Sequence, residues 1–179
     1  WRGKLQLVKV HRDDGPDGRA ILKDVGHMMA ETMSAMPVPH ISNLLLASST
    51  ETLAVIQECQ VIAATTVRHH QYFLEIELLA VKGTEQRLGY GAFLMGKLIQ
   101  LSEELGYRWV LTSADDTAVP FFMANGFSPD VTMPKKCYSG AITHYEHSLL
   151  MQLDLQKAQM RTAHLSDCVV FPVPTTAFL

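Results

Sequence analysis

The sequence predicts a single α+β domain (mixed α/β) with a mixed, mostly antiparallel sheet flanked by helices, and three observations support this fold class. The chain has 179 residues, 47% hydrophobic and 18% charged, which suits one well-buried core but not two ordinary domains. Three β-type runs follow one another through short connections, as in antiparallel hairpins. A long helix then joins the third run to a fourth, and such a crossover is expected to be parallel and right-handed.

The first expected elements are a strand and a methionine-rich helix. Residues 5–10 alternate apolar and polar side chains, which predicts a strand, and the Asp- and Gly-rich run 13–18 predicts a loop. From Ala20 onward, apolar residues recur at helical spacing until the prolines of residues 37–39 break the pattern. We expect the methionines of this helix in the core, although such residues can also form an adaptable binding face. A short helix is expected at residues 41–46.

The central part of the chain contains the strongest patterns. Three β-type runs are expected at residues 52–57, 61–68 and 73–81. The most regular helix pattern covers residues 89–105, with Gly106 as its stop and a stripe formed by Leu94, Leu98, Leu101 and Leu105. A strand, a helix closed by Gly126 with Pro120 in its first turn, and a final strand are expected at residues 109–112, 117–125 and 149–155.

Composition argues against several classes of function. The net charge is -3 and the 15 Lys and Arg are scattered, so direct nucleic-acid binding is disfavoured. No stretch approaches the roughly 20 apolar residues of a membrane span, so no membrane partner is expected. The cysteines are odd in number and far apart, which favours a reducing compartment. Because the sequence does not begin with Met, we expect a fragment of a longer protein.

The histidines do not predict a metal centre. His69 and His70 are adjacent, and His144 and His147 lie three residues apart, but neither pair has the HExxH pattern of a helical zinc site. We interpret them as surface-loop histidines and expect no metal.

The run Gln-Arg-Leu-Gly-Tyr-Gly at residues 86–91 is a candidate phosphate-binding loop between a strand and a helix. Glycines let backbone amides approach an anion, and a helix N-terminus supplies unpaired donors with a favourable dipole. A purely structural turn is an equally open interpretation of the two glycines alone. Residues 91–97 have the spacing of a nucleotide P-loop, but Leu98 stands where a magnesium-binding hydroxyl is required, so we reject that function.

The pattern Gln86-x-x-Gly89-x-Gly91 resembles the Q/R-x-x-G-x-G/A signature with which enzymes of the GNAT superfamily hold the pyrophosphate of acetyl-CoA. Residues 73–76, 111–127 and 136–151 further resemble the PCAF-like histone lysine acetyltransferases of that superfamily. The resemblance covers residues 5–155. It implies the GNAT acyltransferase fold for residues 1–155, with the parallel crossover at the acetyl-CoA site, and leaves residues 156–179 as an extension of unknown role.

The resemblance also implies a set of site residues. Glu75 stands at the position of the family's catalytic glutamate. The implied contacts to acetyl-CoA, which leaves as CoA, come from Leu79, Ala80, Val81, Gln86, Arg87, Leu88, Gly89, Tyr90, Gly91, Ala92, Ala118, Phe121 and Phe122. Amides around Leu79 and Val81 are expected to face the developing oxyanion. Substrate contacts are expected from Glu77, Asp115, Tyr138 and Tyr145.

The chemistry of amine acetylation agrees with a glutamate base. A free lysine has a pKa near ~10.4 and must lose a proton before it attacks a thioester, and a partly desolvated carboxylate accepts a proton more readily. Glu77 points the same way as Glu75 in a regular strand and is the rival candidate, although we interpret it as a rim charge or a substrate contact.

Two departures from the family pattern leave the general acid open. Leu79 replaces a usual cysteine, and Pro120, Phe121 and Phe122 replace a Gly-Tyr-Phe run, so the tyrosine hydroxyl used by some members is absent. Tyr138, Tyr145 or water remain as alternative proton donors to the leaving thiolate, and direct departure of the thiolate is a further alternative.

Acidic residues near the expected cleft favour a cationic peptide such as a lysine-rich histone tail; they are Glu75, Glu77, Asp115, Asp116, Asp130 and Glu146. The resemblance further implies a nuclear protein, with a cytoplasmic location left open, within a larger chromatin-associated protein or complex. Two alternatives remain: a GNAT enzyme acting on protein N-termini or small amines, and an acetyl-CoA-binding or protein-docking module without catalysis.

Overall fold

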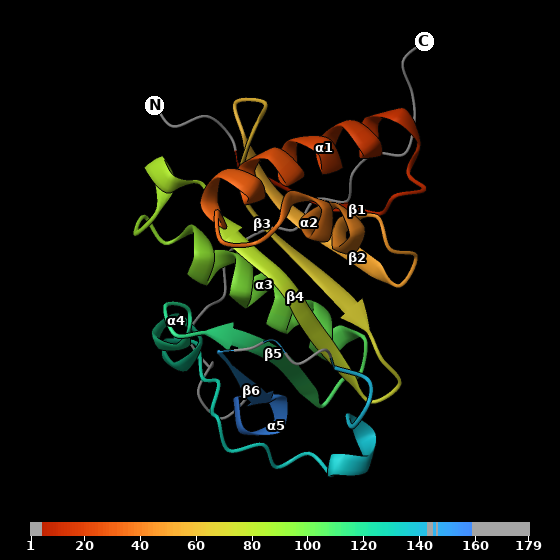
Figure 1. Ribbon diagram of the computed structural model, residues 1–179, viewed down its shortest axis with the longest axis vertical. Helices are drawn as coiled ribbons and strands as arrows, with labels where there is room; N and C mark the ends of the chain where they lie inside the picture. The colour runs from red at the N-terminus through yellow and green to blue at the C-terminus, as the bar shows by residue number, and fades with distance from the viewer. Residues whose placement is uncertain (1–4, 143–144, 146, 159–179) are drawn as a thin grey trace. The chain divides into compact units, whose positions relative to one another are not determined.

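The computed structural model describes residues 5–142, 145 and 147–158 (Figure 1). Its six strands form one sheet in the order β1-β2-β3-β4-β5-β6, which confirms the mixed α/β class. None of the described helices is long and apolar enough to cross a membrane. The elements in chain order are β1 (Leu5–Val10), α1 (Gly15–Thr32), α2 (Val38–Leu45), β2 (Thr50–Gln57), β3 (Gln60–His69), β4 (Phe73–Val81), η1 (Gly83–Glu85), α3 (Tyr90–Glu104), β5 (Trp109–Asp115), α4 (Val119–Ala124), η2 (Lys135–Cys137), β6 (Ser148–Asp154) and α5 (Leu155–Ala158).

The described chain divides into two compact units. The first contains the residues up to Thr66 and the segment Leu78–Leu94, and the second contains Val67–Glu77 and the residues from Met95 onward. Strand β4 and helix α3 therefore contribute residues to both units.

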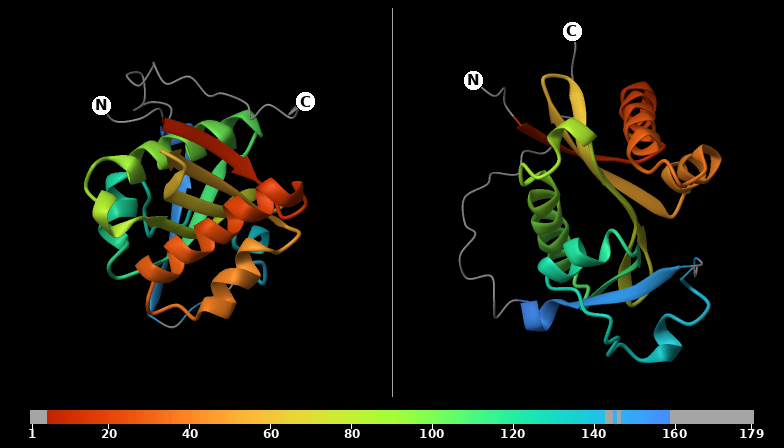
Figure 2. Two further views of the ribbon diagram at one scale, coloured as in Figure 1. Left: turned by 90° about the horizontal axis from the view of Figure 1, so that it is seen from above. Right: turned by 60° about the vertical axis from the view of Figure 1, so that its left-hand side comes forward.

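In the first unit, α1 and α2 lie side by side and pack on the strands (Figure 2). β1 and β2 are antiparallel, from Leu5 opposite Gln57 to Val10 opposite Thr52. Apolar side chains of the two helices meet those of the strands in a buried cluster formed by Val8, Val10, Leu22, Val25, Met28, Met29, Ile41, Leu44, Leu45, Ala54, Val61, Ala64, Leu78 and Ala80. Met28 and Met29 are thus in the core, as predicted, whereas Met33 and Met36 lie beyond α1 and are only partly buried.

The hairpin from β2 to β3 turns through Glu58 and Cys59, whose φ angles are 50° and 62°. Two consecutive positive φ angles in a two-residue connection are typical of a type I′ turn, which matches the twist of the flanking strands. The sequence lacks the Asn-Gly pair that usually marks this turn, so its type could not be predicted.

In the second unit, β4 and β5 are parallel, from Phe73 opposite Trp109 to Ile76 opposite Thr112, which confirms the parallel crossover. β5 and β6 are antiparallel along their whole lengths. The segment between α4 and β6, which includes η2, closes a second cluster of buried residues formed by Phe73, Leu111, Met133 and Ile142. Phe73 therefore anchors the beginning of β4 in a packed core.

Several expected boundaries were wrong, and local chemistry explains the first two. Helix α1 begins at Gly15, inside the expected loop, because Pro16 suits the first helical turn and Asp17 complements the helix dipole there. Helix α2 begins at Val38 instead of residue 41, because Pro39 is also tolerated in a first turn.

The later boundaries differ where tertiary packing decides. β5 continues to Asp115 because β6 pairs with it along that length. α3 ends at Glu104, where Gly106 (φ 78°) closes the helix as predicted, so Leu105 lies outside the buried stripe and is 51% exposed. α4 covers only Val119–Ala124, and β6 gives way to α5 at Leu155. The expected extension from residue 156 falls mostly outside the described residues.

Candidate functional site

Strand β4 carries two buried carboxylates in the second unit, Glu75 and Glu77. Residues two apart in a strand point to the same face, and the two side chains are only 5% and 6% exposed. Neither is a solvated charge on a strand surface. Burial of a carboxylate is unfavourable unless a partner compensates for the lost water, and each of these two has a basic partner.

The partner of Glu75 is His70. Its Nε2 lies 2.6 Å from Glu75 Oε2, and its side chain is 15% exposed. The imidazole also stacks on Phe73, with ring centroids 4.2 Å apart and an interplanar angle of 14°. The interpretation of His70 as a surface-loop histidine was therefore wrong. A contact five residues apart, made across the tight connection from β3 to β4, leaves no signal in the sequence.

The partner of Glu77 is Arg68, whose Nε lies 2.6 Å from Glu77 Oε1. Burial and the neighbouring Glu75 carboxylate raise the pKa of Glu77, while Arg68 and His70 oppose that rise. Glu77 is therefore more enclosed than a rim charge, one of the two roles that the sequence suggested for it, and the other role, a substrate contact, stays a prediction. Arg68 was not among the predicted site residues.

Tyr145 belongs to the same cluster. Its own burial, followed by the charges of Glu77 and Glu75, raises the pKa of the Tyr145 phenol, and Arg68 lowers it. The hydroxyl therefore stays protonated at neutral pH and can donate a hydrogen bond. Ser148 fixes this part of the chain, because its amide and its hydroxyl both donate to the Tyr145 carbonyl, at 3.2 and 2.8 Å.

The parallel register of β4 and β5 stops directly beside this cluster. Ile76 and Thr112 form its last pair, and the Thr112 hydroxyl donates to the Ile76 carbonyl at 3.1 Å. Both strands continue beyond this pair.

The glycine-containing loop lies in the first unit, between η1 and α3. Gln86, Arg87, Leu88 and Gly89 are exposed, whereas Tyr90 is buried and its hydroxyl donates to Gln57 Oε1 at 3.1 Å. The buried Tyr90 thereby anchors the first residue of α3. At the other end of the loop, Gln86 Nε2 donates to the Val81 carbonyl at 3.3 Å. The loop is held at both ends and open between them.

The backbone of this loop fits an anion. Arg87 and Gly89 have φ angles of 61° and 91°, and a Cβ added to Gly89 meets no atom within 4 Å. The first α3 hydrogen bond joins the Phe93 amide to the Gly89 carbonyl at 2.9 Å. The amides at the start of a helix lack intrahelical partners, and a left-handed residue beside them builds an anion-binding nest. At Gly89, a glycine with open space around it thus lies directly before the N-terminus of α3, where the helix dipole favours negative charge.

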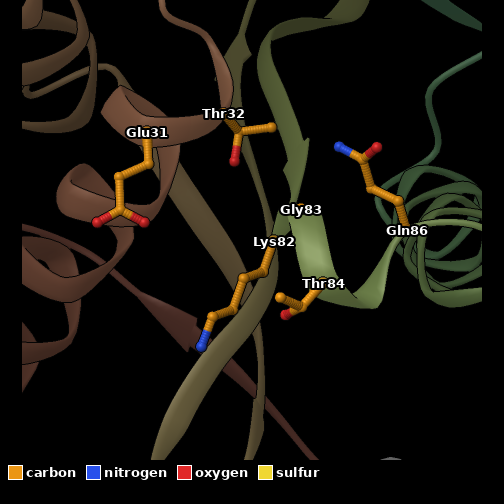
Figure 3. A pocket seen from close by; sticks show the side chains of 6 residues that line it. All are labelled: Glu31, Thr32, Lys82, Gly83, Thr84 and Gln86. Carbon is orange, nitrogen blue, oxygen red and sulfur yellow. The ribbon is translucent and has the colours of Figure 1, made fainter.

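A surface pocket of about 360 Å³ adjoins the same loop (Figure 3). It is lined by Glu31, Thr32, Lys82, Gly83, Thr84 and Gln86. The end of α1 thus faces the turn after β4, and Lys82 Nζ donates to Gln60 Oε1 at 3.0 Å. No sequence motif joined these two segments, so the pocket was not predicted.

The predicted residues after β5 have mainly structural contacts. Phe122 is buried and makes edge-on contacts with Phe121 and Phe127, at centroid distances of 5.4 and 5.2 Å. Ala118 is half-buried at the start of α4, and Tyr138 packs half-buried against the cluster around Phe73.

Asp115 holds its own loop. Its Oδ1 accepts hydrogen bonds from the Thr117 hydroxyl at 2.6 Å and from the Thr117 and Ala118 amides at 2.8 and 2.9 Å. These bonds, the one from the Thr117 hydroxyl above all, hold the pKa of Asp115 below its usual value. Asp116 and Asp130 are exposed, while His144 and Glu146 lie outside the described residues. Within the described ranges, no group of three His, Cys, Asp or Glu side chains could hold a metal ion.

A protein-family profile described as "Acetyltransferase (GNAT) domain" matches residues 21–146, which is most of the chain. The chain belongs to the GNAT family of acetyltransferases. It is 30% identical to the histone acetyltransferase GCN5 of Debaryomyces hansenii over 157 residues, which are 86% of this chain and 34% of that protein. It is 31% identical to the GCN5 protein of Oryza sativa over 154 residues, with coverage of 84% and 30%. The chain thus spans about a third of the length of these curated relatives.

Solved structures agree with this assignment. The crystal structure of Tetrahymena GCN5 superposes with a TM-score of 0.79 at 27% identity, covering 84% of this chain and 96% of that one. The Tetrahymena GCN5 catalytic domain in complex with coenzyme A has a TM-score of 0.70 at 25% identity, with coverage of 93% and 98%.

Proposed function

We propose that this GNAT domain is an acetyl-CoA-dependent protein lysine N-acetyltransferase that acts on histone tails. The observation that carries the proposal is Glu75, a buried carboxylate held by a basic partner on the strand that precedes the glycine-containing loop. The chain belongs to an acetyltransferase family and is similar to proteins named histone acetyltransferases, which supports the same function.

The glycine-containing loop is the proposed pyrophosphate site. Acetyl-CoA would supply the acetyl group as a thioester. The backbone amides of residues 87–91 would hold its diphosphate, and the dipole of α3 favours the negative charge there. Tyr90 keeps the helix start in place through Gln57. The predicted contacts of Leu79, Ala80 and Val81 along β4 belong to the same proposal.

Glu75 is the proposed general base. A proton would leave the substrate ammonium for a Glu75 oxygen, and the freed amine lone pair would attack the acetyl carbon of the thioester. The bond to sulfur would then break, and the second proton that the nitrogen loses as the amide forms would balance the proton taken up by the departing thiolate. Amides around Leu79 and Val81 are the proposed donors to the thioester oxygen, and one such donor is worth roughly 2.7–4 kcal/mol. Tyr145, which stays protonated, is one proposed donor to the departing thiolate, beside Tyr138 and water.

The buried acids also suggest how a lysine would be recognised. Glu77 and Tyr145 share the cluster of Glu75, so an incoming ammonium would meet two carboxylates and one phenol. Asp115 is a weaker candidate for substrate contact, because one of its oxygens already accepts three hydrogen bonds from its own loop. We further propose a nuclear role within a larger chromatin-associated protein, since the curated relatives are named histone acetyltransferases and are about three times as long.

The test is a panel of acceptors incubated with the protein and acetyl-CoA and read by mass spectrometry. It contains lysine-rich histone-tail peptides, the same peptides with every lysine replaced by arginine, a lysine-free peptide with a free N-terminus, and small polyamines. We expect acetylation of the lysine-containing tails alone. Transfer to the free N-terminus or to the polyamines would assign a different GNAT substrate, and binding of acetyl-CoA without any transfer would indicate a docking module.

A further inference from the structure

The contact between His70 and Glu75 is closer and more enclosed than a surface ion pair. Nε2 and Oε2 are 2.6 Å apart, and both side chains are largely removed from water. Hydrogen bonds to ionised groups are shorter and roughly twice as strong as those between neutral groups. Such a contact constrains where the carboxylate points.

The imidazole is itself held rigidly. The His70 amide donates to the Phe73 carbonyl at 3.0 Å, which tightens the connection from β3 to β4. The ring stacks on the Phe73 ring at 4.2 Å, and Phe73 is fully buried among Leu111, Met133 and Ile142. Because His70 is held against the well-packed Phe73, it restricts the movement of the Glu75 carboxylate.

The other polar groups of the cluster do not replace His70 in this role. Arg68 Nε lies against Glu77, 2.6 Å from its Oε1, and Tyr145 is a neutral phenol near both carboxylates. A carboxylate has two oxygens. If Nε2–H donates to Oε2, Oε1 is left to accept the proton of a substrate amine.

We propose that His70 is a positioning residue for Glu75, holding Oε2 so that Oε1 is presented to the lysine ammonium. The proposal rests on the proposed function of Glu75 as general base. His70 touches neither the substrate nor acetyl-CoA in this scheme, and it acts through the carboxylate.

The kinetic test compares His70→Ala, His70→Gln and the matched control His69→Gln. His69 is the next residue in the chain, is exposed, and places Nδ1 3.1 Å from the Tyr107 hydroxyl. We expect kcat to fall about 10- to 100-fold in His70→Ala, because a misplaced base loses part of its contribution to the rate. The KM for acetyl-CoA should stay unchanged. His70→Gln should recover most of this loss because its amide can donate to Oε2, and His69→Gln should match the wild type.

A second measurement does not depend on activity. In protein with ¹⁵N-labelled histidines, we expect His70 to carry a proton on Nε2, with a signal that moves upfield in Glu75→Gln because a neutral amide is a weaker acceptor. Protonation on Nδ1 alone, or a signal unchanged in Glu75→Gln, overturns the proposal. So does a folded His70→Ala protein with wild-type kcat. A wild type that transfers no acetyl group counts instead against the proposed function.

Discussion

At the scale of single residues, two glutamates on one strand face have different surroundings. Glu75 lies against an imidazole and Glu77 against a guanidinium. Pairs of carboxyls placed in unlike environments are how proteins give similar side chains separate tasks. Here a guanidinium and an imidazole give the two carboxylates different partners, and Glu75 is the one that we propose as the acceptor of the substrate proton.

Glu77 provides a prediction about stability and pH. Burial raises its pKa above the ordinary value of 4.5, so the folded state favours the protonated carboxyl. Its contribution to stability is therefore complete below pH 4.5 and is lost as pH rises through the higher folded pKa. We expect Glu77→Gln to gain stability relative to the wild type across that window, measured as the free energy of unfolding in urea at several pH values. A difference independent of pH would contradict the assignment.

Asp115 provides the opposite case. Its pKa lies below the ordinary 3.8, so its contribution to stability is present above pH 3.8 and is lost as pH falls through the lower folded pKa. We expect Asp115→Ala to cost about 1 kcal/mol at neutral pH, the typical net contribution of an intramolecular hydrogen bond. Thermal melts of both proteins should converge at acidic pH. An equal cost at every pH would show that the hydrogen bonds to Thr117 and Ala118 do not matter.

At the scale of elements, helix α3 (Tyr90–Glu104) is flanked by two glycines with positive φ angles. Gly89 has φ 91° at its start and Gly106 has φ 78° at its end, and a Cβ added at either position meets no atom within 4 Å. Alanine is therefore disfavoured at both positions by backbone conformation alone, by roughly 1–2 kcal/mol. The two sites form a matched pair for separating stability from binding.

We predict that Gly89→Ala and Gly106→Ala both lower the melting temperature, but that only Gly89→Ala weakens acetyl-CoA binding. We expect the affinity for acetyl-CoA to fall about tenfold, which corresponds to about 1.4 kcal/mol of binding free energy lost through backbone strain or displaced amides. Isothermal titration calorimetry of the two variants measures it. Equal affinities would mean that the Gly89 loop does not hold the diphosphate.

The elements also show what could be predicted. The end of α3 at Gly106 and the parallel placement of β4 and β5 followed from glycine chemistry and from the crossover pattern. The turn at Glu58 and Cys59 could not be predicted, because neither residue prefers a positive φ. His70 and Arg68 were missed for a related reason: their contacts depend on how tightly the chain turns into β4, which side-chain pattern does not encode.

At the scale of the whole molecule, the order and spacing of the motifs predicted the GNAT family, and the match of residues 21–146 to the GNAT acetyltransferase profile confirmed that prediction. A single glycine pattern would not have sufficed, since a structural turn explains it equally well. The pocket lined by Glu31 and Lys82 lay beyond such reasoning, because it joins segments about fifty residues apart. The lysine substrate is a proposal that rests on the buried acids of β4 and on the likeness to proteins named histone acetyltransferases.

The most direct test of the central claim is single-turnover acetyl transfer to a histone-tail peptide by wild type, Glu75→Gln and Glu77→Gln at saturating acetyl-CoA. Loss of a general base predicts a fall of about 10²–10⁴-fold in Glu75→Gln with unchanged calorimetric affinity for acetyl-CoA. Glu77→Gln, two residues along the same face and equally buried, should lose no more than about tenfold. A folded Glu75→Gln protein that transfers acetyl at the wild-type rate would contradict the account.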